Sequence, residues 1–207
     1  GNVYAIAYRG DGDDGFLKTI TIDTNGTISS APIDTLEFDE KKAHAPSALH
    51  VGGDIFAIAY QGQSDDGFVK TVRISNVGVI QDIIIDSMEF DADRGESPDF
   101  VRAQGNIYAI AYRGASERGY VKTITIDGSG LIGDLAIDTL QFDTRAMDVK
   151  IIFVAGDVYA IAYSGQNDVG FLNTIRIQGT GMIQDAVIDT LEFDTQHGRE
   201  PSMRYIS

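Results

Sequence analysis

The chain has 207 residues, a formal net charge of −15 and 43% hydrophobic residues, and it contains no cysteine. This length allows one large or two small domains, and the absence of cysteine excludes disulfides and thiolate chemistry. The acidic charge argues against nucleic acid or an anionic membrane as a partner, because phosphate binding needs a basic surface. No apolar run is long enough to cross a membrane, and no signal peptide is recognisable. The charge fits an extracellular or cell-surface setting.

The sequence consists of four copies of one unit. Equivalent units begin at Gly1, Gly53, Gly105 and Gly156, at spacings of 52, 52 and 51 residues. A further step of 52 would return to the phase of position 1, so the repeats describe a cycle. We therefore expect a single domain built from units 1–52, 53–104, 105–155 and 156–207.

The first predicted element of each unit is an apolar strand. Val3–Tyr8 reads VYAIAY and returns as IFAIAY, IYAIAY and VYAIAY at residues 55–60, 107–112 and 158–163. Its β-branched and aromatic residues, closed by a polar residue and glycine, predict a strand. Alternation leaves both faces apolar, so we expect this strand to be covered on both sides.

Three further strands follow in each unit. After a polar loop, Phe16–Ile22 forms the second strand, and a turn at Asn25-Gly26 leads to the third, Ile33–Asp39. One face of the third strand is more polar, as expected of an outer strand. The fourth predicted strand is the least uniform and begins with proline in three units. Its copies are Pro46–Val51, Pro98–Ala103, Val149–Val154 and Pro201–Ile206.

Four antiparallel strands in about 50 residues, without helical periodicity, resemble the blade of a β-propeller. The resemblance rests on the elements at Tyr4–Tyr8 and Ile33–Phe38 and their copies, and it covers the whole chain. The WD-dipeptide, kelch and sialidase Asp-box motifs are not matched. The resemblance implies an all-β fold, a four-bladed β-propeller of four-stranded antiparallel blades.

The phase of the repeat predicts how such a ring closes. With the fourth strand innermost, the C-terminal strand at Pro201–Ile206 would complete the blade that starts at Gly1, removing an exposed edge. We expect a monomer closed by its N- and C-terminal strands. The alternative is a dimer in which each chain forms half of an eight-bladed ring.

Aspartate and tyrosine each occupy one position in every unit. Asp34, Asp86, Asp138 and Asp189 would form either a ring of cation ligands or hydrogen bonds within the blades. We favour hydrogen bonds, because a partly buried carboxylate needs partners. The tyrosines at positions 8, 60, 112 and 163 are expected to pack between blades with the hydroxyl near the rim, rather than to stack on a sugar.

The units differ most in two sets of loops, which follow the first and third strands. Two strands, the second and the third, separate the two loops of each unit, so both sets should lie on the same face of the ring. Loops on a rigid scaffold commonly carry binding sites, and we predict a ligand-binding face here; the alternative is drift in unconstrained surface loops. The candidate residues are Asp13, Asp14, His44, Asp65, Asp66, Asp93, Arg94, Glu96, Arg145, Asp148, His197, Arg199 and Glu200.

No cofactor is expected, and metal motifs are weak. The DGDDG stretch at Asp11–Gly15 resembles a calcium loop, but it lacks the closing glutamate and flanking helices of an EF-hand. Calcium there, or an ion in the channel, is the one alternative. The three histidines have no zinc-ligand spacing, and no nucleophile-elbow, P-loop or dinucleotide motif occurs.

These observations predict a non-enzymatic binding or interaction module for a carbohydrate or a protein. Near-identical units favour binding over catalysis, because an active site needs unlike residues. The first alternative is a glycan-cleaving hydrolase or lyase that uses carboxylates from Asp93, Glu96, Asp148 and Glu200. The second is a structural repeat segment of a larger surface protein.

Overall fold

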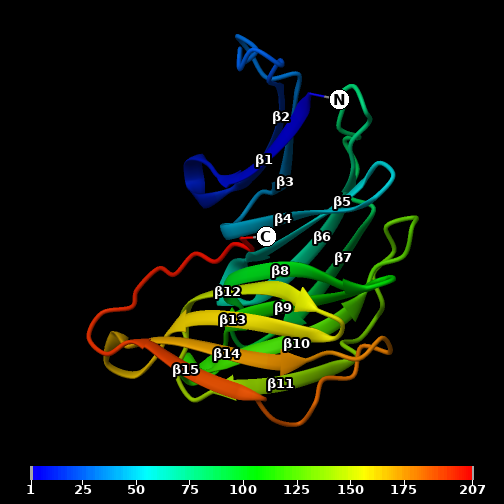
Figure 1. Cartoon of the computed structure of the whole chain (residues 1–207). Coiled ribbons are helices and arrows are strands. Elements are labelled where there is room, and N and C mark those ends of the chain that lie inside the picture. Colours follow the sequence, from blue (N-terminus) through cyan, green and yellow to red (C-terminus); the bar gives the residue numbers. More distant parts are fainter. Residues whose placement is uncertain (1, 207) are drawn as a thin grey trace.

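A computed structural model describes residues 2–206 as four antiparallel sheets that follow one another around an arc (Figure 1). The first sheet contains β1 (Val3–Arg9), β2 (Gly15–Thr21) and β3 (Asp34–Asp39). The second contains β4 (His44–Gly52), β5 (Ile55–Gln61), β6 (Gly67–Arg73) and β7 (Asp86–Asp91). The third contains β8 (Glu96–Gln104), β9 (Ile107–Arg113), β10 (Gly119–Thr125) and β11 (Asp138–Asp143). The fourth contains β12 (Met147–Ala155), β13 (Val158–Ser164), β14 (Gly170–Arg176) and β15 (Asp189–Asp194).

The strand order confirms the predicted phase of the repeat. In each four-stranded sheet the order follows the chain, and the predicted fourth strand lies at one edge, with a proline near its start in β4 and β8 but not in β12. That strand comes from one unit, while its three neighbours come from the next. Strand β8 packs against both β4 and β12, so these edge strands are innermost and the polar third strands are outermost.

Short 3-10 turns connect the first and second strands of each unit, where the sequence analysis predicted polar loops. They are η1 (Asp11–Asp13), η2 (Gln63–Asp65), η3 (Ala115–Glu117) and η4 (Gln166–Asp168). The hairpin after the second strand turns at Gly26 and its copies, where φ is +84° at Gly26 and +90° at Gly78. A positive φ favours glycine there, as predicted.

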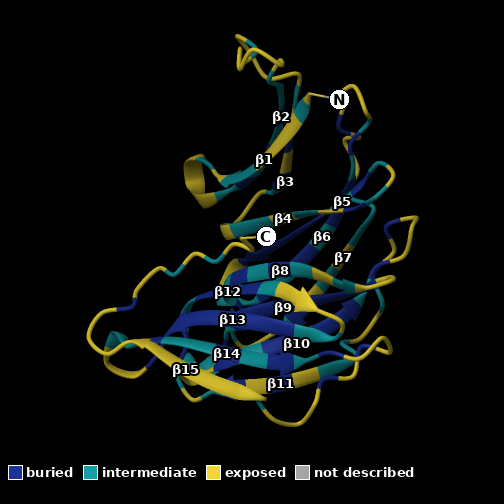
Figure 2. Cartoon of the chain, in the orientation of Figure 1, coloured by how far each residue is buried: buried dark blue, intermediate teal, exposed yellow. Residues whose placement is uncertain are grey.

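The apolar strand is buried on both faces in three of its four copies. In β9, residues 108–112 are fully buried, and β5 and β13 are buried almost throughout. The exception is β1, where Tyr4 is 50% and Ile6 46% exposed although the sequence matches that of β13 (Figure 2). Burial therefore depends on a neighbouring sheet on each side, and the first sheet has one on one side only.

Ring closure is not seen in this structure. Among residues 2–206, strand β1 pairs with β2 alone and its other edge has no partner strand. Residues Pro201–Ile206, which we predicted as a strand, form none. A strand forms only where a partner edge supplies its hydrogen bonds, and β1 does not lie beside this segment in pairing register. Ser202–Arg204 instead line a cavity with residues of β4, β8 and β12.

Candidate functional site

The loops that follow the first and third strands lie together on one face, as predicted; we call this the loop face. In each unit, one backbone hydrogen bond ties the two loops. Ala43 N donates to Asp13 O, and the equivalent bonds join Gly95 to Asp65, Ala146 to Glu117 and Gly198 to Asp168, each at 2.8 Å. Every loop pair is therefore held in the same geometry, while its side chains differ.

The backbone of the loop face is strained at repeated positions. The last residue of each 3-10 turn has a positive φ without being glycine, for example +71° at Asp13 and +66° at Glu117. Positive φ also recurs one residue before the prolines, at Ala45, Ser97 and Glu200, and at the equivalent Asp148. Such conformations cost on the order of 1–3 kcal/mol each and often mark functional sites. The residue types gave no signal for them.

The starts of the innermost strands surround a cavity of about 410 Å³, which we call the mouth. All four units contribute to it. Its lining residues are Ala45, Pro46, Ser47, Ser97, Pro98, Asp99, Asp148, Lys150, Glu200 and Pro201.

Of the predicted site residues, Asp148 and Glu200 line the mouth. They are close together, since the Glu200 N–H donates to Asp148 Oδ2 at 3.4 Å. The sequence analysis missed Asp99 and Lys150, whose charged atoms lie 3.9 Å apart, although their place just after the proline position was a usable signal. Asp99 Oδ2 also accepts a hydrogen bond from the Ile151 N–H of the neighbouring strand at 2.9 Å. The mouth thus combines carboxylates with one ammonium group.

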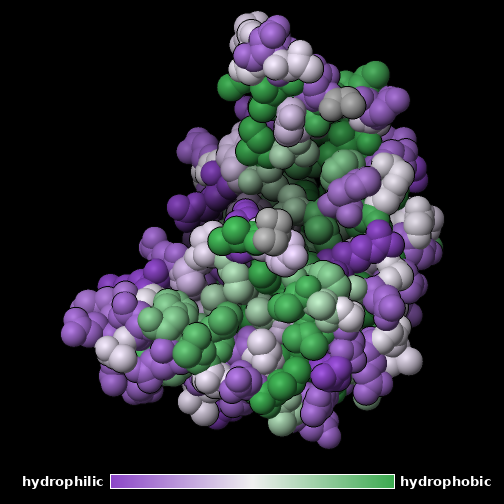
Figure 3. Space-filling view, viewed as in Figure 1, coloured by the Kyte–Doolittle hydropathy of each residue, from purple (hydrophilic) through white to green (hydrophobic). Residues whose placement is uncertain are grey.

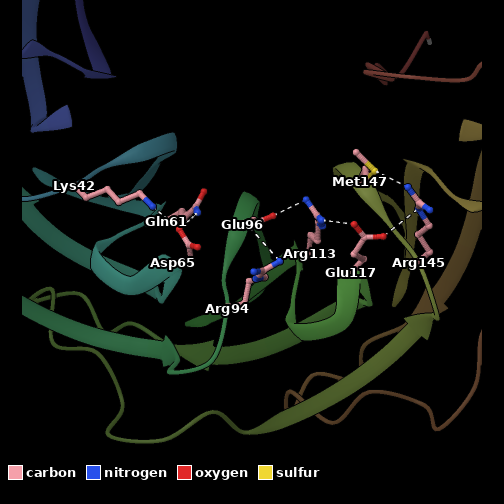
Figure 4. A network of polar contacts seen from close by, with 9 residues as sticks. All are labelled: Lys42, Gln61, Asp65, Arg94, Glu96, Arg113, Glu117, Arg145 and Met147. Carbon is pink, nitrogen blue, oxygen red and sulfur yellow. Dashed lines mark hydrogen bonds and ion pairs between the residues drawn. The ribbon is translucent and has the colours of Figure 1, made fainter. Parts of the chain in front are cut away.

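A row of charged side chains runs along the loop face, and we call it the rim (Figure 4). Arg113 bridges Glu96 and Glu117 at 2.7 Å each, and Arg145 lies 3.4 Å from Glu117. Arg94 reaches Glu96 at 3.6 Å. These contacts place three predicted site residues, Arg94, Glu96 and Arg145, in one network.

The rim continues at the second sheet. Lys42 and Gln61 both donate to Asp65 Oδ1, and the hydrogen bond from Lys42 lowers the pKa of the Asp65 carboxyl. Lys42 belongs to the first unit and Asp65 to the second, so this part of the rim joins neighbouring units across their loops.

At the two ends of the arc the rim contacts remain within one unit. Arg9 lies 3.0 Å from His44 Nε2 and 3.4 Å from Asp13. Arg199 pairs with Asp168, which lowers the pKa of that carboxyl. His197, which the sequence analysis also named, follows Asp194 and donates its N–H to that carboxylate at 2.8 Å.

Three predicted site residues belong neither to the mouth nor to the rim. Asp14 is beside Glu37, and burial together with the nearby Asp14 charge raises the pKa of the Glu37 carboxyl. Asp93 is exposed and Asp66 half-buried in their loops, and neither lines the cavity.

The repeated aspartates and tyrosines hold neighbouring sheets together. Asp34 Oδ2 accepts a hydrogen bond from Ile80 N in the second sheet at 2.8 Å, and Asp86 and Asp138 make the same bond to Ile132 and Ile183. The Tyr60 hydroxyl donates to Asp39 Oδ2 at 2.7 Å. Burial, then the bond to this carboxylate, raises the tyrosine pKa. Their role is structural, as the sequence analysis favoured.

No group of three or more His, Cys, Asp or Glu side chains suited to a metal ion occurs among residues 2–206. Within the same residues, no helix is long and apolar enough to cross a membrane.

Comparison with solved structures identifies the fold. A putative 6-phosphogluconolactonase from Bacteroides uniformis is 10% identical with a TM-score of 0.54, and the match covers 93% of this chain and 69% of that one. AofleA from Arthrobotrys oligospora, a fungal lectin, is 10% identical with a TM-score of 0.57, covering 95% of this chain and 55% of that one. Sqt1 from Chaetomium thermophilum is 17% identical with a TM-score of 0.52, covering 86% and 41%.

The chain is a β-propeller repeat protein. The similarity shows the fold alone, because these propellers include a lectin, a WD40 protein and a lactonase-like protein. The chain spans 69% of the length of the lactonase-like protein and about half or less of the other two. No family description matches the sequence, and no curated protein is similar to it.

Proposed function

We propose that this propeller is a non-enzymatic binding module whose loop face takes a carbohydrate or a protein. The observation that carries the proposal is the mouth, a cavity of about 410 Å³ that is lined by charged and apolar residues and to which all four units contribute. The backbone that lines the mouth is the same in each unit, but the side chains at equivalent positions differ between units and include serine, aspartate, lysine and glutamate. Binding residues commonly lie on loops that vary in sequence and are positioned by a rigid scaffold, and the mouth has this arrangement.

The chemistry of the mouth favours a polar ligand. Asp99, Asp148 and Glu200 offer carboxylate oxygens, which accept hydrogen bonds from hydroxyl or amide groups. Lys150 adds donors beside them, and the three prolines give flat apolar surface. Sugars and exposed peptide segments present this mixture of groups. The repeated backbone hydrogen bonds fix the loops before binding, which reduces the entropy cost of association.

A glycan-cleaving enzyme is the second candidate, because Asp148 and Glu200 share one cavity. Hydrolysis of a glycosidic bond needs two carboxyl groups on opposite sides of the scissile bond. Against this, Asp93 does not reach the mouth, and Glu96 is engaged by two arginines.

The two functions separate in one set of measurements. The wild type, Asp148→Asn, Glu200→Gln and Asp82→Asn are applied to a glycan array with and without calcium, and tested for turnover of the same glycans. Asparagine tolerates the positive φ of residue 148, and Asp82 is an exposed control on the opposite face. Binding that is lost in the two mouth variants but kept in Asp82→Asn, without turnover, supports the proposal.

Turnover lost in the mouth variants would make the protein an enzyme. A blank array, followed by no capture of a protein partner that depends on the mouth, would leave the structural repeat segment. Calcium-dependent binding would direct attention to the Asp11–Asp14 turn.

The complete ring is part of the proposal. A ring would be completed either by the chain's own terminal strands, with four blades, or by a second chain, with eight blades; the open first and fourth sheets favour the second chain. Both arrangements keep the mouth at the axis.

A further inference from the structure

One set of contacts recurs at all three junctions between sheets. A tyrosine hydroxyl donates to an aspartate of the preceding sheet at the pairs Tyr60–Asp39, Tyr112–Asp91 and Tyr163–Asp143. A threonine hydroxyl donates to a glycine carbonyl of the following sheet at 2.6 Å each, at the pairs Thr19–Gly78, Thr71–Gly130 and Thr123–Gly181. Together with the Asp–Ile bonds above, these contacts define the inter-sheet interface.

The first sheet carries one half of this interface without its complement; we call this its leading face. Ile28 is 61% exposed, whereas its equivalents Ile80 and Ile183 are 3% and 4% exposed. Tyr8 makes no hydrogen bond to a carboxylate among residues 2–206, although Tyr60 and its copies do. Lys18 lies 5.6 Å from the Tyr8 ring centre but forms no ion pair within the described chain, whereas Lys70 binds Asp39 at 2.9 Å.

The fourth sheet carries the other half, its trailing face. All six residues of β15 are exposed, including Leu191 at 57%, whereas the equivalent Leu36 is 8% exposed (Figure 2). Thr174 donates no hydrogen bond within residues 2–206, and Asp189 Oδ2 accepts none there. In the described part of the chain, the Asp194 carboxylate accepts hydrogen bonds only from the backbone N–H groups of Gln196 and His197. Apolar side chains are visible over both ends of the arc in Figure 3.

The two faces are complementary residue by residue. In the internal interfaces, the residues equivalent to Tyr8 and Lys18 both contact the aspartate equivalent to Asp194, as Tyr60 and Lys70 contact Asp39. In the same interfaces, the backbone N–H of the residue equivalent to Ile28 donates to the carboxylate equivalent to that of Asp189. The leading face therefore presents a free ammonium and hydroxyl where the trailing face presents a carboxylate, and each presents an apolar surface to the other.

A second copy of the chain can meet these faces without any change to the three internal interfaces. The three internal interfaces are already satisfied, with nearly equal distances, while the arc is open. Bringing the first and fourth sheets together within one chain would change the angle between neighbouring sheets at these interfaces. Docking a second copy repeats the observed geometry unchanged. The arc also matches only part of longer propellers.

We propose that the trailing face of one chain binds the leading face of a second copy, head to tail. In the dimer, the Pro201–Ile206 segment of the first copy leaves the cavity that it lines with β4, β8 and β12 of its own chain. It then adds the missing innermost strand to the free edge of β1 in the second copy by β-augmentation. A head-to-tail contact of this kind closes into a ring when the rotation allows it. Two chains would complete the mouth with loops from both.

The test uses two variants, each with one damaged face. Ile28→Asp damages the leading face and Leu191→Asp the trailing face, and both residues are exposed in the single chain, so folding is retained. Leu135→Asp, at an 80% exposed site on the third unit, is the control. Masses are measured by light scattering over a wide concentration range, with circular dichroism to verify the fold.

The wild type and the control are expected to reach twice the chain mass of 22.4 kDa. Each face variant alone should stay at the chain mass, with association weakened about tenfold or more. Mixing the two variants should restore a dimer, because the intact trailing face of one meets the intact leading face of the other. A monomeric wild type, unaffected variants, or a mixture that stays monomeric would each overturn the proposal.

Discussion

The hydroxyl of Tyr112 tests the inter-sheet interface most simply. It donates to Asp91 Oδ2 at 2.6 Å, in a site where Lys122 also binds this carboxylate at 3.0 Å. Tyr112→Phe removes the hydroxyl but keeps the ring, which packs against Phe90 at a centroid distance of 5.0 Å. A hydrogen bond to a charged group contributes about 1.5–3 kcal/mol. We expect the free energy of unfolding to fall by this amount.

The repeat supplies a matched control in Tyr8→Phe. Tyr8 occupies the equivalent position but has no carboxylate partner among residues 2–206, so its substitution should change stability by about 0.5 kcal/mol or less. Urea unfolding of both variants, at concentrations where the chain is monomeric, measures the midpoint shift at constant slope. Equal losses in the two variants, or no loss in Tyr112→Phe, would refute the reasoning.

Three further predictions use the same comparison between units. Thr71→Val leaves the buried Gly130 carbonyl without its donor and should cost about 1–3 kcal/mol in urea unfolding, whereas Thr174→Val, which loses no such bond, should be nearly neutral. Gly78→Ala should destabilise more than Gly26→Ala in thermal unfolding: both have positive φ, but a Cβ at Gly78 would lie 2.5 Å from Ile33 Cδ1 and one at Gly26 meets nothing within 4 Å. Burial raises the pKa of the Asp91 carboxyl, but hydrogen bonds from Tyr112 and its other partners outweigh burial and lower it overall. The Asp91 carboxylate therefore stabilises the fold at pH values above its unfolded pKa of 3.8, and this stabilisation is lost as the pH falls below that value. Urea midpoints measured across acidic pH should fall with pH in the wild type, and less steeply in Tyr112→Phe.

Much of the architecture follows from the sequence because it is repeated. The apolar period at Val3–Tyr8, the glycine turn at Gly26 and the polar outer strand at Ile33–Asp39 each predict an element that the structure contains. Comparing the units also separated the structural Asp34 and Tyr60 positions from the varied loops. Four copies of one pattern provide evidence that a single copy would not.

The ends and the mouth were harder to predict. Identical residues at Val3–Tyr8 and Val158–Tyr163 differ in burial because burial depends on a neighbouring sheet, which a local pattern does not encode. The Pro201–Ile206 strand pattern needs a partner edge, and the described chain does not bring one to it. Asp99 and Lys150 reach the mouth because of a strand start held at positive φ, a backbone property that the residue types do not reveal.

Hydrogen exchange of these two identical strands tests the central structural claim, that the first and fourth sheets are the open ends of one repeated interface. Peptides containing Val3–Tyr8 and Val158–Tyr163 are distinguishable by their flanking residues. In dilute monomer we expect protection across β13, and fast exchange at the β1 amides that do not bond to β2. Equal protection of both strands in the dilute monomer would show that the chain closes on itself and would contradict the account.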